Sequence, residues 1–156
     1  MENMPVVKEF IELAELDCAS RHERLVVDAV TKKLKELGFT VREDDTAAKV
    51  EGEAGNVCAY LEGTAKGCVL FAAHLDRVQN GLGIKPRLKD GNLVSDGTTI
   101  LAADDLSGVA AVLDGIRRVL ASGKPYPRIE VLFSVCEEIG PGSSADTMTI
   151  PPLTPT

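Results

Sequence analysis

The sequence is short of several residue types and patterns, and each shortage excludes a class of protein. It has no Trp and only 4% aromatic residues, so its core must be mainly aliphatic. No apolar run approaches the length of a bilayer span, and no basic segment followed by an apolar stretch opens the chain. Its 17 Lys and Arg against 24 Asp and Glu give a net charge of −7, which argues against nucleic acid or a membrane as the partner.

Cysteine and histidine are also scarce. The four cysteines have no CxxC spacing, so we expect free thiols in a reducing cytoplasm: Cys18, Cys58, Cys68 and Cys136. Cys136 stands beside two glutamates but has no histidine partner in sequence, and we interpret it as a small buried hydrophobic residue. Of the two histidines, we place His22 on the surface, in the first turn of a helix.

The residues that are present follow the pattern of one α/β domain. The chain's 156 residues are enough to form one hydrophobic core. Apolar residues at helical spacing predict helices that begin near Pro5, at Ser20 and after Asp104. Ser20 and Glu23 fit a capping box for the second of these helices. The third continues to about Gly123.

Strand patterns fill the space between the predicted helices. β-prone runs predict strands at 39–41, 56–61, 68–73 and 129–135, the last in the centre of the sheet. Asp90-Gly91 predicts a hairpin, and residues 44–55 have the polar composition of a loop.

Three acidic clusters stand at the ends of these predicted elements. His74-Leu75-Asp76 follows one strand, Asp104-Asp105 opens the third helix, and Glu137-Glu138 follows the last strand. Taken singly, each cluster has an ordinary explanation, such as a solvated loop or charges that complement a helix dipole. In an open α/β sheet, however, groups beyond the carboxyl ends of different strands converge on one crevice. One imidazole and five carboxylates there would repel one another unless a cation held them, so the pattern predicts a divalent metal site.

Longer motifs carry a family resemblance that extends from about residue 10 to about residue 140. They are His74-Leu75-Asp76, residues 83–86, residues 94–101, Ala103-Asp104-Asp105, Gly108 and residues 137–140. With these motifs the sequence resembles the peptidase T (tripeptide aminopeptidase)-like branch of the dinuclear zinc exopeptidases, which also include carboxypeptidases and desuccinylases. The resemblance implies a three-layer αβα sheet domain. It also implies a cytoplasmic, metal-dependent exopeptidase that removes N-terminal residues from short peptides.

The resemblance also implies a role for each clustered residue. His74 would bind the first of two metal ions, Asp104 would bridge both, and Glu138 would bind the second. Asp76 would contact the His74 ring from behind and fix its tautomer. Glu137 would be the general base for the attacking water. The ions would be Zn²⁺, with Co²⁺ or Mn²⁺ as alternatives, and the Asp104–Asp105 peptide bond would be cis.

Two departures from the family pattern shape the expectation for this chain. Family members are longer and carry a further aspartate and a further histidine as ligands, so only partial ligand sets are present here. We therefore expect residues 1–142 to be a partial catalytic domain, incomplete at the C-terminus and without the family's lid and dimerisation domain. Residues 143–156 would be a disordered tail unrelated to the family. Arg77 stands where relatives carry a small hydroxyl residue, which would place a cation beside the site.

Three functional hypotheses follow. The first is an aminopeptidase for short peptides, of which this chain is an inactive or weakly active fragment. The second is a carboxypeptidase or N-acyl amino acid deacylase of the same clan. The third is a degenerate, non-enzymatic domain that retains a partial metal site. In each case the incomplete sheet would expose apolar surface and favour self-association.

Overall fold

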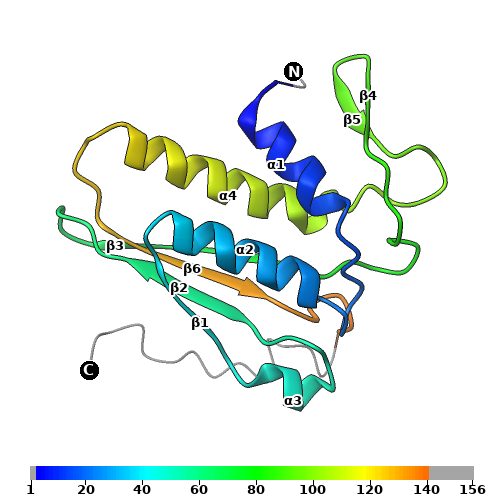
Figure 1. Ribbon diagram of the computed structural model, residues 1–156, viewed down its shortest axis with the longest axis horizontal. Helices are drawn as coiled ribbons and strands as arrows, with labels where there is room; N and C mark the ends of the chain where they lie inside the picture. The colour runs from blue at the N-terminus through cyan, green and yellow to red at the C-terminus, as the bar shows by residue number, and fades with distance from the viewer. Residues whose placement is uncertain (1–2, 141–156) are drawn as a thin grey trace.

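A four-stranded mixed sheet in the order β1-β2-β6-β3 forms the centre of the computed structural model, which describes residues 3–140 (Figure 1). Its strands are β1 (Thr40–Glu43), β2 (Val57–Leu61), β3 (Cys68–His74) and β6 (Arg128–Ser134). β2 runs antiparallel to both β1 and β6, whereas β3 runs parallel to β6, with His74 opposite Ser134. β6 therefore lies inside the sheet, as its sequence predicts.

Two helices cover one face of this sheet, α2 (Arg24–Glu36) and α4 (Ala103–Ala121), and α1 (Pro5–Ala14) packs against α4 (Figure 1). Alternate residues of β6 are buried, namely Ile129, Val131 and Phe133. They join the apolar stripes of the helices in one core, in which Leu13, Val30 and Leu113 are fully buried. The predicted α/β class is confirmed, and the described residues supply the sheet and the helices of one face.

The start of α2 differs from the prediction. The helix begins at Arg24, and Arg21 before it has a left-handed φ of 76°. Ser20 and Glu23 do not form a capping box, because the Ser20 hydroxyl donates to Asp76 and Glu23 accepts from the amides of Arg21 and Cys136. Contacts with distant segments thus outcompete the local cap.

The polar stretch at 44–55 contains a short helix that we did not predict, α3 (Thr46–Val50). Asp44 accepts from the Thr46 amide at 3.0 Å and from the Asn56 amide at 2.8 Å, which closes this segment. A five-residue helix is too short to display a periodic apolar pattern, so composition alone could not reveal it. The predicted hairpin is confirmed as β4 (Arg87–Lys89) and β5 (Asn92–Val94).

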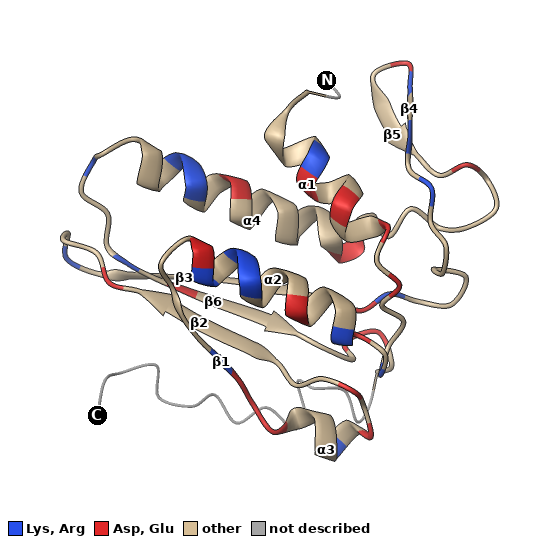
Figure 2. Ribbon diagram, in the orientation of Figure 1, with Lys and Arg blue, Asp and Glu red and all other residues tan. Residues whose placement is uncertain are grey.

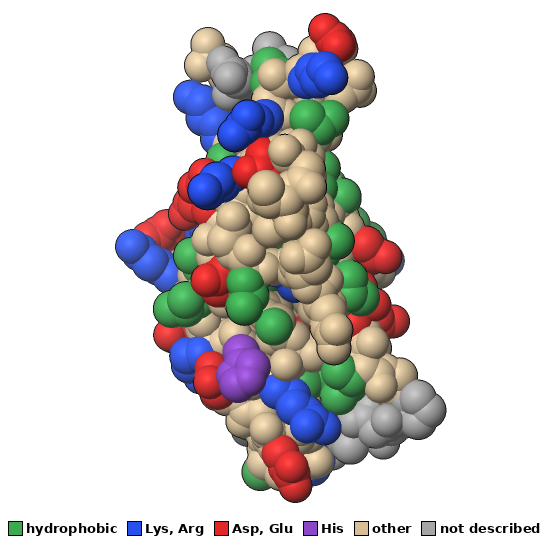
Figure 3. Space-filling model, turned by 90° about the vertical axis from the view of Figure 1, so that its right-hand side faces the viewer, with side chains coloured by type: hydrophobic (Ala, Val, Ile, Leu, Met, Phe, Trp, Pro, Cys, Tyr) green, Lys and Arg blue, Asp and Glu red, His purple; other side chains and the backbone are tan. Residues whose placement is uncertain are grey.

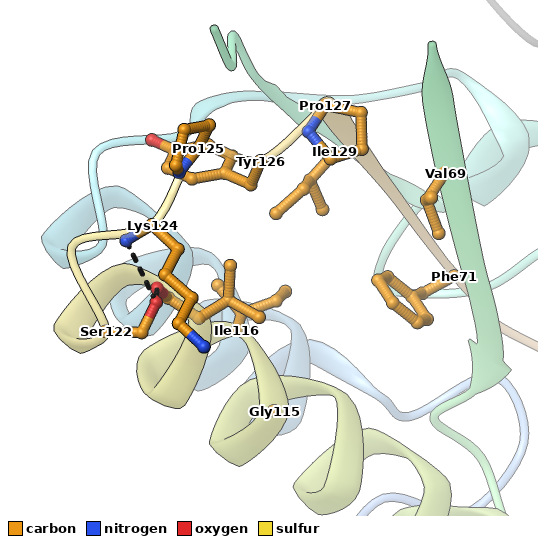
Figure 4. Close-up of a pocket in the computed structure, with 11 residues that line it drawn as sticks. Val69, Phe71, Gly115, Ile116, Ser122, Lys124, Pro125, Tyr126, Pro127 and Ile129 are labelled. Carbon is orange, nitrogen blue, oxygen red and sulfur yellow. Dashed lines mark hydrogen bonds between the residues drawn. The ribbon is translucent and has the colours of Figure 1, made fainter. Parts of the chain in front are cut away.

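The outer strand β3 carries the most exposed apolar residues of the sheet. Val69, Leu70 and Phe71 are 41%, 53% and 37% exposed. On its helix-facing side, Val69 and Phe71 lie across from Ile116 and Ile129 around an open cavity of about 350 Å³ between β3, α4 and the loop before β6 (Figure 4). Within the sheet, the exposed apolar surface therefore lies along β3, whereas β6 pairs with a strand on both edges.

The structure tests two further sequence expectations only within the residues that it describes. Within residues 3–140, no helix is long and apolar enough to cross a membrane. The expected tail at 143–156, and with it the boundary at residue 142, lies outside the described residues and stays a prediction.

Candidate metal centre

The three acidic clusters meet at one edge of the sheet. The parallel pairing of β3 and β6 brings His74 and the turn after Ser134 to the same end, and the start of α4 lies there as well (Figure 2). Asp104 and Asp105 have non-helical backbone angles and are joined by a cis peptide bond, as the resemblance implied. The Asp105 carboxylate lies against Gly108, where a Cβ would clash. The convergence predicted from strand ends is therefore present.

His74, Asp104 and Glu138 form a set of possible metal ligands. One donor atom from each lies within 4.8 Å of the other two. The His74 side chain is 11% exposed and its Nε2 is 3.0 Å from Asp104 Oδ1, while the Asp104 side chain is 85% exposed. An imidazole nitrogen with two carboxylates suits Zn²⁺ and related divalent ions, so the donor set fits the implied metal.

The electrostatics of this edge also fit a cation. Burial alone would lower the pKa of His74, but the carboxylates of Asp76, Asp104 and Glu137 raise it to about 9. Partial burial, followed by the nearby charges of Asp104 and Asp76, raises the pKa of Glu138 despite the opposing effect of His74. Negative charge is thus concentrated here, and a bound cation would relieve the repulsion.

Asp76 has more partners than the resemblance implied. His74 Nδ1 lies 3.1 Å from the Asp76 carbonyl oxygen and 3.5 Å from its carboxylate. The same carboxylate accepts from the Glu137 amide at 2.9 Å, the Glu138 amide at 3.1 Å and the Ser20 hydroxyl at 2.6 Å. Burial opposes ionisation, yet these hydrogen bonds lower the pKa of Asp76. Asp76 therefore ties the loop after β3 to the turn after β6.

Glu137 stands beside the ligand set and outside it. Its side chain is 53% exposed, and its Oε2 is 4.0 Å from His74 Nε2. Glu138 belongs to the set of three, so the two adjacent glutamates occupy different positions. This difference is compatible with the base and ligand roles that the resemblance implies, which stay predictions.

Arg77, the residue after Asp76, is buried. It is 1% exposed, and its guanidinium donates to the carbonyl oxygens of Ala14, Leu16 and Gly81 and to the Cys18 sulfur. Through these hydrogen bonds the guanidinium holds the segment at the end of α1 and the backbone at Gly81. Arg77 therefore anchors the loop that follows β3, and it lines the same pocket as Glu138.

The remaining sequence candidates behave as simple structural residues. His22 is exposed, as predicted, and lies 2.8 Å from Glu53, although it precedes α2 instead of opening it. Cys136 is fully buried, and burial together with Glu23 raises the pKa of its thiol to about 12, which disfavours a thiolate nucleophile. All four cysteines are free.

Sequence reasoning missed one residue next to the site. Glu23 is fully buried, and its Oε1 accepts from the Cys136 amide, directly before the two glutamates. Burial raises the pKa of this carboxyl group. Its sequence pattern pointed to a local cap, and only its burial beside β6 reveals the different role.

Around this end of the molecule, acidic and basic side chains are interspersed on the surface (Figure 3).

Comparison with known proteins places these features in a class. An aminopeptidase named PepT from Bacillus cereus has a solved structure with a TM-score of 0.84 and 42% identity, covering 87% of this chain. A tripeptidase from Staphylococcus aureus gives a TM-score of 0.87 and 30% identity over 93% of this chain. The described residues therefore have the fold of part of a zinc-exopeptidase-like catalytic domain.

The family follows from the sequence. Residues 56–155 match the description "Peptidase family M28", and the chain belongs to that family. An uncharacterized protein of Bacillus subtilis, YqjE, is 36% identical over 136 residues, which are 86% of this chain. The chain spans only 37% of YqjE, 37% of the B. cereus chain and 39% of the S. aureus chain.

Proposed function

We propose that this chain is the N-terminal part of the catalytic domain of a cytoplasmic, dinuclear metallo-aminopeptidase that acts on short peptides. The observation that carries the proposal is the meeting of His74, Asp104 and Glu138 donor atoms within 4.8 Å, with Glu137 beside them. The aminopeptidase and tripeptidase named among the similar structures support the substrate class.

In this proposal each residue of the cluster has a defined role. His74 and Asp104 would hold the first metal ion, and Asp104 and Glu138 would hold the second. Two such divalent ions, most simply Zn²⁺, would supply Lewis-acid polarisation of the scissile carbonyl and a lowered pKa for the attacking water. Glu137, whose side chain is 53% exposed and whose Oε2 lies 4.0 Å from His74 Nε2, would accept the proton of that water.

Asp76 keeps this arrangement in place. The Asp76 carbonyl oxygen faces His74 Nδ1, which leaves Nε2 directed toward Asp104. Ring orientation of this kind fixes which nitrogen is available to a metal. Because each ion has only two ligands from this chain, we propose that the isolated chain binds metal weakly and has little or no activity.

The test is a graft. Residues 3–140 would replace the corresponding segment of the B. cereus aminopeptidase, which supplies the rest of the domain. We expect the hybrid to hydrolyse tripeptides with a free amino end, to leave N-acetylated peptides intact, and to lose activity with His74→Ala. Hydrolysis of acylated substrates alone would favour the deacylase hypothesis. A folded hybrid that binds two metals but cleaves neither would favour a degenerate domain.

A further inference from the structure

Two buried carboxylates hold the turn that follows β6. The Cys136 amide donates to Glu23 Oε1 at 2.9 Å, the Glu137 amide to Asp76 Oδ1 at 2.9 Å, and the Glu138 amide to Asp76 Oδ2 at 3.1 Å. Both carboxylates are fully buried. Three successive backbone amides, which carry the two glutamates of the candidate site, are thus bound by side chains from two distant segments.

The backbone of this turn needs such support. Cys136 has a φ of 55°, in the left-handed region that a residue with a Cβ seldom occupies. This bend ends the extended course of β6 and changes the direction in which the next residues point. Hydrogen bonds from an amide to a carboxylate are roughly twice as strong as neutral ones, so they stabilise the bend.

Glu23 contributes to the turn without belonging to the ligand set. Its Oε1 accepts from the Arg21 amide at 3.0 Å as well as from Cys136, and it links the start of α2 to the end of β6. Its Oε2 is buried without a hydrogen-bond partner among residues 3–140. Burying a carboxylate with an unpaired oxygen opposes folding. If this position served packing alone, an apolar side chain would therefore stabilise the fold more than Glu23.

We infer that Glu23 is a positioning residue of the metal centre, which together with Asp76 clamps residues 136–138 and so directs Glu137 and Glu138. The metal-related part of this inference rests on the proposed function. The clamp itself concerns the folded chain alone and is measurable without metal. Glu23 acts through the backbone, since its contacts in this turn are with the amide and thiol of Cys136.

The experiment compares three variants of the whole chain. Glu23→Ala removes the acceptor, and Glu23→Gln keeps a neutral oxygen in nearly the same volume. The matched control is Glu9→Gln, which changes another buried carboxylate, 6% exposed and paired with Lys33. Two quantities are measured: exchange rates of the amides of residues 136–138 by NMR in the metal-free chain, and the dissociation constant for Co²⁺ from its absorption spectrum.

In the Glu23→Ala variant we expect the Cys136 amide to exchange about tenfold faster or more, as for the loss of a hydrogen bond to a charged group. Its Co²⁺ affinity should fall by about 10- to 100-fold, the usual effect of removing a group that orients metal ligands. Glu23→Gln should change both quantities by roughly threefold, because a neutral acceptor is weaker. Glu9→Gln should lower the melting temperature and leave both quantities unchanged.

A folded Glu23→Ala variant with wild-type exchange and Co²⁺ affinity would overturn the inference. So would a Glu9→Gln control that changes both as strongly. If Glu23→Ala does not fold, Glu23→Gln decides by the same criteria. If the wild-type chain binds no Co²⁺, the proposed metal function fails, and the exchange rates alone then judge the clamp.

Discussion

The charge of His74 should make the stability of the metal-free chain depend on pH. Its pKa is raised from the usual 6.5 to about 9 by the carboxylates around it, which favour the imidazolium. A raised pKa in the folded state stabilises the fold fully below pH 6.5, and this stabilisation is lost as the pH rises through about 9. The window of falling stability is therefore pH 6.5 to 9.

The size of the effect follows from the same shift. A rise from 6.5 to about 9 corresponds to at most about 3.4 kcal/mol. Because the Asp104 side chain is 85% exposed, solvent screens part of this attraction, and we expect about 1 to 2 kcal/mol. For a chain of 156 residues this corresponds to a decrease of roughly 2 to 8 °C in melting temperature.

The assay is thermal unfolding between pH 6 and 9.5 in the presence of a chelator. His74→Gln should remove this pH-dependent loss, whereas the exposed histidine in His22→Gln serves as the control and should retain it. Divalent metal should counteract the loss, since metal binding competes with the proton and strengthens as the pH rises. If His74→Gln keeps the full wild-type pH dependence between 6.5 and 9, the reasoning is refuted.

Three further predictions follow from the site, the Arg77 anchor and the outer strand. In the hybrid enzyme, Glu137→Gln should keep its metal and lose roughly 10²–10⁴ in turnover. Glu138→Gln should instead lose its second metal. If metal analysis shows that Glu137→Gln loses metal and Glu138→Gln keeps it, the base and ligand roles of the two glutamates are reversed. Arg77→Met should lower the free energy of unfolding, measured in urea, by about 3 kcal/mol or more, because it leaves buried carbonyl oxygens unpaired. Arg77→Lys should restore little of this stability. Leu70→Lys, at the 53% exposed position of β3, should reduce self-association in light scattering, and an already monodisperse wild type would contradict this.

Much of the fold was predictable because its signals are local. Residues 129–135 are β-prone in an unbroken run, and the apolar spacing after Asp104 covers five turns of α4, so both elements were identified nearly to their ends. The place of the candidate metal centre followed as well, since polar residues at the carboxyl ends of strands share one edge of a sheet.

The exceptions are residues whose partners are far away in sequence. Ser20 and Glu23 match a capping box, yet they bind Asp76 and Cys136, 56 and 113 residues away. Arg77 follows the metal-binding motif, yet its donors are used by the end of α1.

The sequence by itself therefore determined the α/β class, the main elements and the residues that gather at the sheet edge, because each is encoded by neighbouring residues. Only the tertiary structure decided that Glu23 and Asp76 hold the backbone amides of residues 136–138 beneath the candidate metal centre. That choice depends on burial and on hydrogen-bond partners that come together only when distant segments pack, since a buried polar group must find whatever partner the fold places next to it.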